Sequence, residues 1–236
     1  MTMKKAKTAR KKVVFLFDVD NTLLNNDQVT ADLQKHLAQE IGSLGAKHYW
    51  ELFEALRHQL GYADYLGALQ RYRIKYPHDL RVLTVSRFLI DYPFANRLFA
   101  NSLDAIRHVA QSGRVVLLTD GDVVFQPRKV RRSGLFEEVD GNVLIYVHKE
   151  HELADVAERY PAEHYVMLDD KLRILAAMKK VWGKQLTTIF VRQGHYAMDP
   201  AVVASNPPAD MTLERIGDLL KYSLRDLLAA AHASAP

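Results

Sequence analysis

The chain has 236 residues, of which 48% are hydrophobic and 25% charged, a balance typical of a globular protein with one large domain or one domain plus an insertion. It contains no cysteine, which excludes disulfides, thiolate zinc sites and cysteine nucleophiles and fits a reducing cytoplasm. No apolar run approaches the roughly 20 residues that a helix needs to cross a bilayer, so we expect no membrane partner.

The first twelve residues carry the positive excess of the chain. Six of its 32 Lys and Arg residues lie there, and the formal net charge of the whole chain is +4. No aromatic residue is interleaved among them to stack on bases. We therefore expect residues 1–12 to form a disordered, solvated arm rather than a nucleic-acid-binding arm.

Residues 13–17 form an uninterrupted apolar run, which predicts a buried central strand of a parallel sheet. The run ends at Asp18 and Asp20, which Asn21 and Thr22 follow. Carboxylates at the carboxyl edge of a buried strand cost free energy unless a ligand uses them. A hard cation such as Mg²⁺, which prefers oxygen ligands, would neutralise the pair. The alternative is a turn that carries two solvated Asp residues.

Residues 25–99 are rich in helix formers and carry no convincing strand. Gly42, Gly45 and Gly61 should divide this segment into several short helices. We therefore expect a helical insertion. Tyr, Trp, His and Arg residues crowd into it; some could line a substrate pocket, whereas most should pack inside the insertion or lie on its surface.

Strands and helices alternate from residue 100 onwards. We expect strands over 115–118, 143–147, 165–168 and 187–191 and helices over about 102–112, 127–133, 150–160 and 172–181. A polar stretch over 199–210 should lead to a closing helix over about 213–231. Such alternation implies an α/β fold, with a parallel sheet and helices on both faces.

Polar residues of specific types follow the later strands. Thr119 follows the strand over 115–118, Lys149 follows the next one closely, and Asp169 and Asp170 follow the strand over 165–168. The ends of parallel strands meet at one edge, so these groups should share a crevice with the first two carboxylates. The acids can hold Mg²⁺, the hydroxyl and the ammonium can hold a phosphate, and a carboxylate can form an acyl-phosphate.

Each of these residues also has a structural interpretation. Thr119 could cap the following turn, and Asp170 could be a helix N-cap. Lys149 could be a surface lysine, because Lys129 and Lys171 compete for its role.

The order and spacing of these motifs are similar to those of the haloacid dehalogenase-like hydrolase superfamily. The first motif, D-x-D-x-T, spans residues 18–22. The second begins at Thr119 and continues through Gly121, Gln126 and Lys129 to the Ser-Gly-Leu-Phe stretch over 133–136. The third is Lys149, and the fourth is the pair Asp169-Asp170.

The resemblance implies a Rossmann-like α/β core domain over 13–24 and 100–236, with a helical cap domain over 25–99. Three positions depart from the superfamily pattern, the first being Leu168, which stands where Gly is frequent. Glu150 follows Lys149 where Pro is frequent, and Arg173 stands where many members carry a second Asp.

The resemblance also implies roles. Asp18 attacks phosphorus, and Asp20 protonates the leaving oxygen and later takes a proton from water. Thr119 and the amide of Asp120 hold phosphate oxygens, and Lys149 neutralises charge on the nucleophile and the phosphate.

The implied Mg²⁺ ligands are Asp18, the carbonyl of Asp20 and Asp169. Asp170 is the other candidate of the acidic pair, and the motif leaves open which of the two binds the metal and which anchors Lys149. An acid at position 20 favours hydrolysis of phosphate esters over dehalogenation, because an alkoxide leaving group needs a proton and a halide does not.

We therefore expect a cytoplasmic, Mg²⁺-dependent phosphatase with a small phosphorylated substrate. A phosphotransferase or mutase on the same core is one alternative. A non-catalytic protein that binds a phosphorylated partner or nucleic acid is the other. Neither the identity of the substrate nor the oligomeric state can be read from these motifs.

Overall fold

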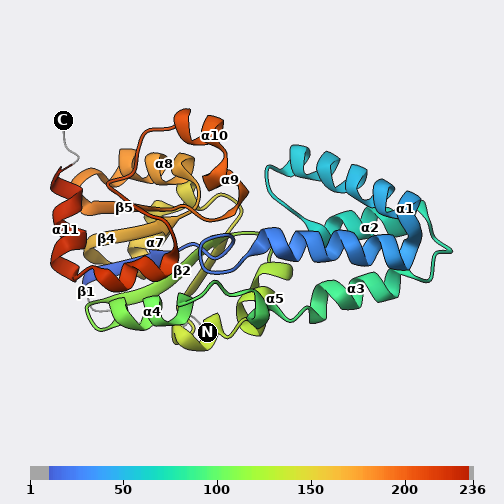
Figure 1. Cartoon of the computed structure of the whole chain (residues 1–236), viewed down its shortest axis with the longest axis horizontal. Helices are drawn as coiled ribbons and strands as arrows, with labels where there is room; N and C mark the ends of the chain where they lie inside the picture. Colours follow the sequence, from blue (N-terminus) through green and yellow to red (C-terminus); the bar gives the residue numbers. More distant parts are fainter. Residues whose placement is uncertain (1–10, 234–236) are drawn as a thin grey trace, which may run out of the picture.

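A computed structural model describes residues 11–233 as a six-stranded parallel sheet with helices on both faces and a helical insertion at one end (Figure 1). The strands are β1 (Lys11–Phe17), β2 (Arg114–Asp120), β3 (Val143–Tyr146), β4 (Ala162–Asp169), β5 (Leu186–Val191) and β6 (Met211–Leu213). The expected α/β, Rossmann-like fold is confirmed. No helix between residues 11 and 233 is long and apolar enough to span a membrane.

The helices of the sheet region cover its two faces. They are α4 (Ser102–Ala110), α5 (Phe125–Arg132), α6 (Leu135–Glu138), α7 (Leu153–Arg159), α8 (Leu172–Trp182), α9 (Gly194–Met198), α10 (Pro200–Ala204) and α11 (Leu224–Ala233), with short 3₁₀ turns η2 (Lys149–His151), η3 (Gly183–Gln185) and η4 (Ile216–Lys221). Side chains of β1 alternate between the faces. Phe15 and Phe17 pack in the cluster that contains α4 residues, whereas Val14 and Leu16 pack in the cluster with α7 and α8.

The strand order is β3-β2-β1-β4-β5-β6, so the chain builds outward from β1 in one direction and then returns to build outward on the other side. The change of direction lies between β1 and β4. Ligands of open α/β sheets bind at such a switch point, beyond the carboxyl ends of the strands. Phe17, the last residue of β1, pairs with Leu117 and Leu168, so these strand ends lie side by side.

The helical insertion consists of α1 (Asn26–Leu60), α2 (Tyr65–Lys75) and α3 (Val82–Asp91), followed by the turn η1 (Phe94–Arg97). Figure 1 shows it projecting from the end of the sheet. Gly61 ends α1 in a left-handed conformation, as predicted. The prediction that Gly42 divides this segment is confirmed: its backbone angles are non-helical (φ 77°, ψ 165°), and the two parts of α1 on either side of it run in opposite directions (Figure 1). The prediction was wrong for Gly45, which lies inside the second part, where a Cβ would come within 2.9 Å of the Tyr72 hydroxyl.

Two further expectations need correction. The expected helix over 213–231 is present only in its second half, as α11; in the first half β6 pairs with β5, and η4 follows. Burial of Leu213 on the sheet and of Ile216 and Leu219 in η4 outweighs the helical pattern of this stretch. At the other end, β1 begins at Lys11, inside the expected arm. The rest of that arm lies outside the described residues.

Candidate active site

Asp18 lies directly beyond β1, at the switch point of the sheet. Its backbone amide donates a 3.0 Å hydrogen bond to the carbonyl of Leu168 in β4, which continues the strand pairing by one residue. The side chain is buried, and its Oδ2 has no hydrogen-bond partner. A carboxylate oxygen is thus buried at the expected edge, but it remains available to a ligand.

Lys149 is fully buried and contacts both sides of the switch point. Its Nζ lies 2.5 Å from Asp18 Oδ1 and 2.8 Å from Asp169 Oδ2, and it donates to the carbonyl of Leu118 at 3.2 Å. Its backbone amide donates to Asp120 Oδ1 at 2.8 Å. Lys149 is therefore not a surface lysine, and the structure places it with three of the predicted carboxylates.

Asp169 and Asp170, which the sequence could not distinguish, have different partners. Asp169 is held by Lys149, and its Oδ1 accepts a 2.8 Å hydrogen bond from the backbone amide of Lys171. Asp170 is equally buried, but neither of its carboxylate oxygens has a partner. Ligand atoms of Asp18, Asp169 and Asp170 lie within 4.8 Å of one another. The side chain of Asp20 is not part of this group.

Burial disturbs the ionisation of the whole cluster. Burial raises the pKa of Asp169 to about 6 although Lys149 acts in the opposite direction, and it raises the pKa of Asp120 and, well above its usual value, that of Asp170. Burial by itself lowers the pKa of Lys149, but the carboxylates around it outweigh this effect and hold that pKa well above its usual value.

The charges of this cluster do not balance. Four carboxylates, those of Asp18, Asp120, Asp169 and Asp170, face only two ammonium groups, those of Lys149 and Lys171. With all four carboxylates ionised, two negative charges are left, which is the charge that one divalent cation supplies. The unpartnered oxygens of Asp18 and Asp170 are hard ligands suited to such a cation, so these residues fit a Mg²⁺-type ion.

Glu150 and Arg173, two of the three departures from the superfamily pattern, contact each other. Arg173 Nη1 lies 2.6 Å from Glu150 Oε1. Burial raises the pKa of Glu150, but Arg173 outweighs it and holds that pKa below its usual range. Glu150 follows Lys149 in η2, and Arg173 lies in the first turn of α8. Their ion pair therefore ties together the two elements that carry Lys149 and the acidic pair.

Thr119 is buried at the end of β2, beside the same crevice. Its hydroxyl accepts a 2.8 Å hydrogen bond from Nε2 of Gln126 in α5. The same amide nitrogen lies 3.4 Å from Asp20 Oδ2. Gln126 thus links the end of the second motif to the second carboxylate of the first.

Asp20 does not belong to the acidic group and is held by Lys129. Nζ of Lys129 lies 2.6 and 2.8 Å from the two carboxylate oxygens of Asp20 and 3.0 Å from Oδ1 of Asn26. Lys129 comes from α5 and is buried, whereas Asn26 is the first residue of α1. Asp20 is therefore connected, through Lys129, to the base of the helical insertion.

The segment over residues 57–65, where α1 ends and α2 begins, contacts several loops around the crevice. A Cβ on Gly61 would come within 3.0 Å of the imidazole of His148, which precedes Lys149. The rings of Tyr65 and Phe125 lie 5.3 Å apart, and the hydroxyl of Tyr65 is 2.9 Å from that of Thr30. We call this segment the roof.

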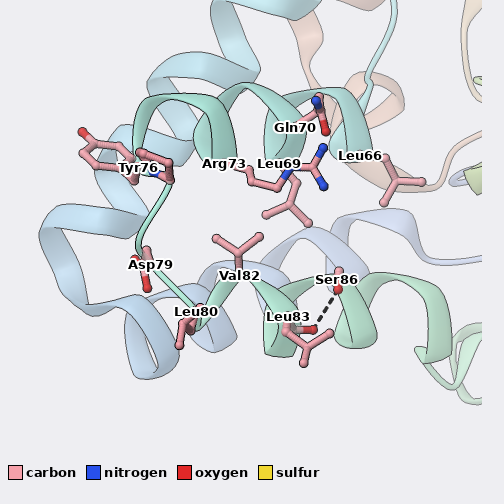
Figure 2. Close-up of a pocket in the computed structure, with 11 residues that line it drawn as sticks. Leu66, Leu69, Gln70, Arg73, Tyr76, Asp79, Leu80, Val82, Leu83 and Ser86 are labelled. Atoms are coloured by element: carbon pink, nitrogen blue, oxygen red, sulfur yellow. Dashed lines mark hydrogen bonds between the residues drawn. The ribbon is translucent and has the colours of Figure 1, made fainter.

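The α2–α3 cavity, of about 370 Å³, lies between these two helices of the insertion (Figure 2). Leucine and valine side chains line most of it, together with Gln70 and Arg73. It contains none of the strand-end carboxylates, and no lining residue belongs to the sheet region. The cavity is therefore separate from the candidate active site.

The sequence analysis missed Asn26, Gln126 and Lys129 as site residues. Gln126 was noticed only as part of the stretch that follows the second motif, and Lys129 in addition only as a competitor for the role of Lys149. Gln126 and Lys129 are three residues apart, so both lie on one face of a helix. This spacing is the signal that could have identified them. Asn26 shows no such signal, because its contact depends on how α1 leaves the sheet.

Comparisons with known proteins agree with this geometry. The family model for haloacid dehalogenase-like hydrolases matches residues 13–181. A Burkholderia xenovorans protein described as a haloacid dehalogenase-like hydrolase is 63% identical, with a TM-score of 0.86 over 90% of this chain and 99% of that one. No match was found among curated proteins.

Two more distant structures share the fold. A Bacillus subtilis hydrolase of this family, solved bound to magnesium, is 20% identical, with a TM-score of 0.61 over 90% of this chain and 98% of that one. The L-2-haloacid dehalogenase of Xanthobacter autotrophicus is 17% identical, with a TM-score of 0.57 over 88% of this chain and 96% of that one.

Proposed function

The chain belongs to the haloacid dehalogenase-like hydrolase family, and on that premise we propose that it is a Mg²⁺-dependent phosphatase acting on a small phosphomonoester. The observation that carries the proposal is the pairing of two differently held carboxylates. Asp18 has a free oxygen inside the charged cluster, and Asp20 lies in a separate network.

In this mechanism a carboxylate oxygen of Asp18 attacks phosphorus. The bond from phosphorus to the ester oxygen breaks, and Asp20 gives a proton to that oxygen as it leaves. Water then attacks the aspartyl-phosphate while Asp20 accepts its proton, and the bond between phosphorus and Asp18 breaks. Asp20 has to exchange its contact with Lys129 for one with the substrate oxygen.

The remaining residues orient the nucleophile and the phosphate and neutralise their charge. Lys149 holds Asp18 in place, and the hydroxyl of Thr119 and the amide of Asp120 are the proposed donors to phosphate oxygens. A bound Mg²⁺ would offset the negative charge of the nucleophile and the phosphate, so that the two anions can approach. We propose Asp18, the carbonyl of Asp20 and Asp170 as its protein ligands.

This choice differs from the ligand that the resemblance favoured. Asp169 is occupied by Lys149 and the amide of Lys171, whereas both oxygens of Asp170 are free. Asp169 is therefore proposed as the anchor of Lys149. In the proposed domain division, residues 25–99 form a cap over the core of 13–24 and 100–236, and the roof closes the crevice against water.

A substrate panel tests the proposal. Purified full-length protein should release phosphate from some members of a set of sugar phosphates, nucleotides and phospho-acids with Mg²⁺, and excess EDTA should abolish this activity. Release of halide from haloalkanoic acids without release of phosphate would contradict the proposal. Phosphoryl transfer to added alcohols in preference to water would favour a phosphotransferase.

A further inference from the structure

Arg57 extends from the last turn of α1 across to the sheet region. Its Nη2 donates a hydrogen bond to the hydroxyl of Tyr196 in α9. Its acidic neighbour is Glu54 on an exposed face of the same helix, with Nη1 and Oε1 3.6 Å apart. Exposed pairs of this kind contribute little free energy, so the charge of Arg57 remains available to a ligand.

Lys171 brings a second cation to the same tyrosine. Its Nζ lies 5.4 Å from the centre of the Tyr196 ring. Lys171 directly follows Asp169 and Asp170; burial lowers the pKa of its ammonium group, but the charges of Asp170, Asp18 and Asp169 outweigh this effect and hold that pKa above its usual value. Tyr196 therefore contacts Lys171 through its ring and Arg57 through its hydroxyl.

Arg57 also acts on the Asp20 side of the crevice. Burial raises the pKa of Tyr65, whereas hydrogen bonds from Thr30 and Asn26 and the charge of Arg57 act to lower it. Asn26 in turn contacts Lys129, which holds Asp20. Arg57 is thus linked through Tyr196 to Lys171 and through Tyr65 to the residues around Asp20.

We propose that Arg57 and Lys171, spaced by Tyr196, form a second anion-binding subsite and that the substrate is a phosphomonoester with a further carboxylate or phosphate group. The inference rests on the proposed phosphatase function. Lys149 is already occupied by Asp18 and Asp169, so it cannot serve this second group. With a neutral substrate the exposed Glu54 is the acidic neighbour that remains to Arg57, whereas a second anion accepts charge-assisted hydrogen bonds from Arg57 and Lys171.

Non-hydrolysable phosphonates test the subsite without turnover. Calorimetry on the full chain with Mg²⁺ compares propylphosphonate with phosphonopropionate and propylene diphosphonate, which add a carboxylate or a second phosphonate to a similar carbon chain. At least one of the two should bind about tenfold or more tightly than propylphosphonate, because a charge-assisted contact is gained. The tighter of the two identifies the second group as carboxylate or phosphate.

Variants then show which residues cause the tighter binding of the doubly anionic phosphonates. Arg57→Gln should reduce it to less than about twofold, and Arg57→Lys should restore part of it. Lys171→Met should also reduce it. Arg73→Gln is the matched control, because Arg73 lines the separate α2–α3 cavity (Figure 2), and it should keep the preference unchanged.

The outcomes separate the two proposals. Equal binding of all three phosphonates, or a preference that survives in Arg57→Gln, would overturn the subsite even if the enzyme hydrolyses phosphomonoesters. Failure of the phosphatase proposal appears instead as no release of phosphate from any ester by the wild-type protein, and it would overturn the subsite as well.

Discussion

Lys149 and Lys129 are both buried ammonium groups that bind one carboxylate of the first motif, but their surroundings differ. The side-chain contacts of Lys149 all lie in the sheet region, and its partners Asp18 and Asp169 are almost completely buried. Lys129 binds Asp20, whose side chain is 25% exposed, and Asn26 at the start of the insertion.

This difference indicates which contacts a movement of the insertion would change. A displacement of α1 would change the contacts of Lys129 and Asp20, whereas the contacts around Asp18 would stay within the sheet. We infer that the sheet region organises the nucleophile and the metal ligands, and that the insertion influences proton transfer and substrate choice. Substitutions on the two sides should therefore have separable effects.

The largest effect is expected on the Lys149 side. Asp18→Asn should lower kcat by at least about 10⁴-fold, because the covalent route is lost. Circular dichroism should show an intact fold, and Asp104→Asn on the exposed face of α4 serves as the control. Near-normal turnover by the folded variant would exclude Asp18 as the nucleophile.

On the other side, Lys129→Met should lower kcat by about 10²-fold, the usual contribution of a positioned proton donor. The affinity for Mg²⁺ should not change, because Lys129 does not contact the acidic group. Steady-state kinetics and Mg²⁺ titration measure the two quantities, with Arg131→Met on the exposed side of α5 as control. If Mg²⁺ binding weakens as much as turnover does, the two sides are not independent.

Metal binding should distinguish the role of Asp170 from that of Asp169. Saturating Mg²⁺, at about a hundred times its Kd, should stabilise the wild-type protein by about 2.7 kcal/mol, a rise in Tm of roughly 5–10 °C. Asp170→Asn should abolish this rise, whereas Asp169→Asn should weaken Mg²⁺ binding by about 10–100-fold through the displaced Lys149. The reverse order would make Asp169 the direct ligand.

The smallest effect is expected in the roof. Tyr62 lies in the loop before α2, where the charge of Asp122 in the sheet region contributes to raising its pKa. Tyr62→Ala should change kcat/KM by roughly tenfold or less, and unequally among substrates, so that their order changes. Asp20→Asn should lower the rate for all of them. An unchanged order in Tyr62→Ala and in similar roof variants would mean that the sheet region alone selects the substrate.

The strands were predictable because their signals are local. Uninterrupted apolar runs end at Asp18, Thr119 and Asp169, and the structure places all three at one edge. The C-terminal region was not predictable in the same way, because β6 exists only through its pairing with β5. The break of α1 at Gly42 was predictable because glycine is a local signal, whereas the absence of a break at Gly45 depends on packing against Tyr72 of α2.

The sequence by itself determined the parallel sheet, the helical insertion and the set of carboxylates at the strand ends, because hydrophobic periodicity and motif spacing act over short stretches of chain. Only the tertiary structure decided which lysine binds which carboxylate. Lys149 and Lys129 lie 131 and 109 residues from Asp18 and Asp20, and their choice depends on register and on the angle of α5. The meeting of Arg57 with Tyr196, 139 residues apart, was decided in the same way.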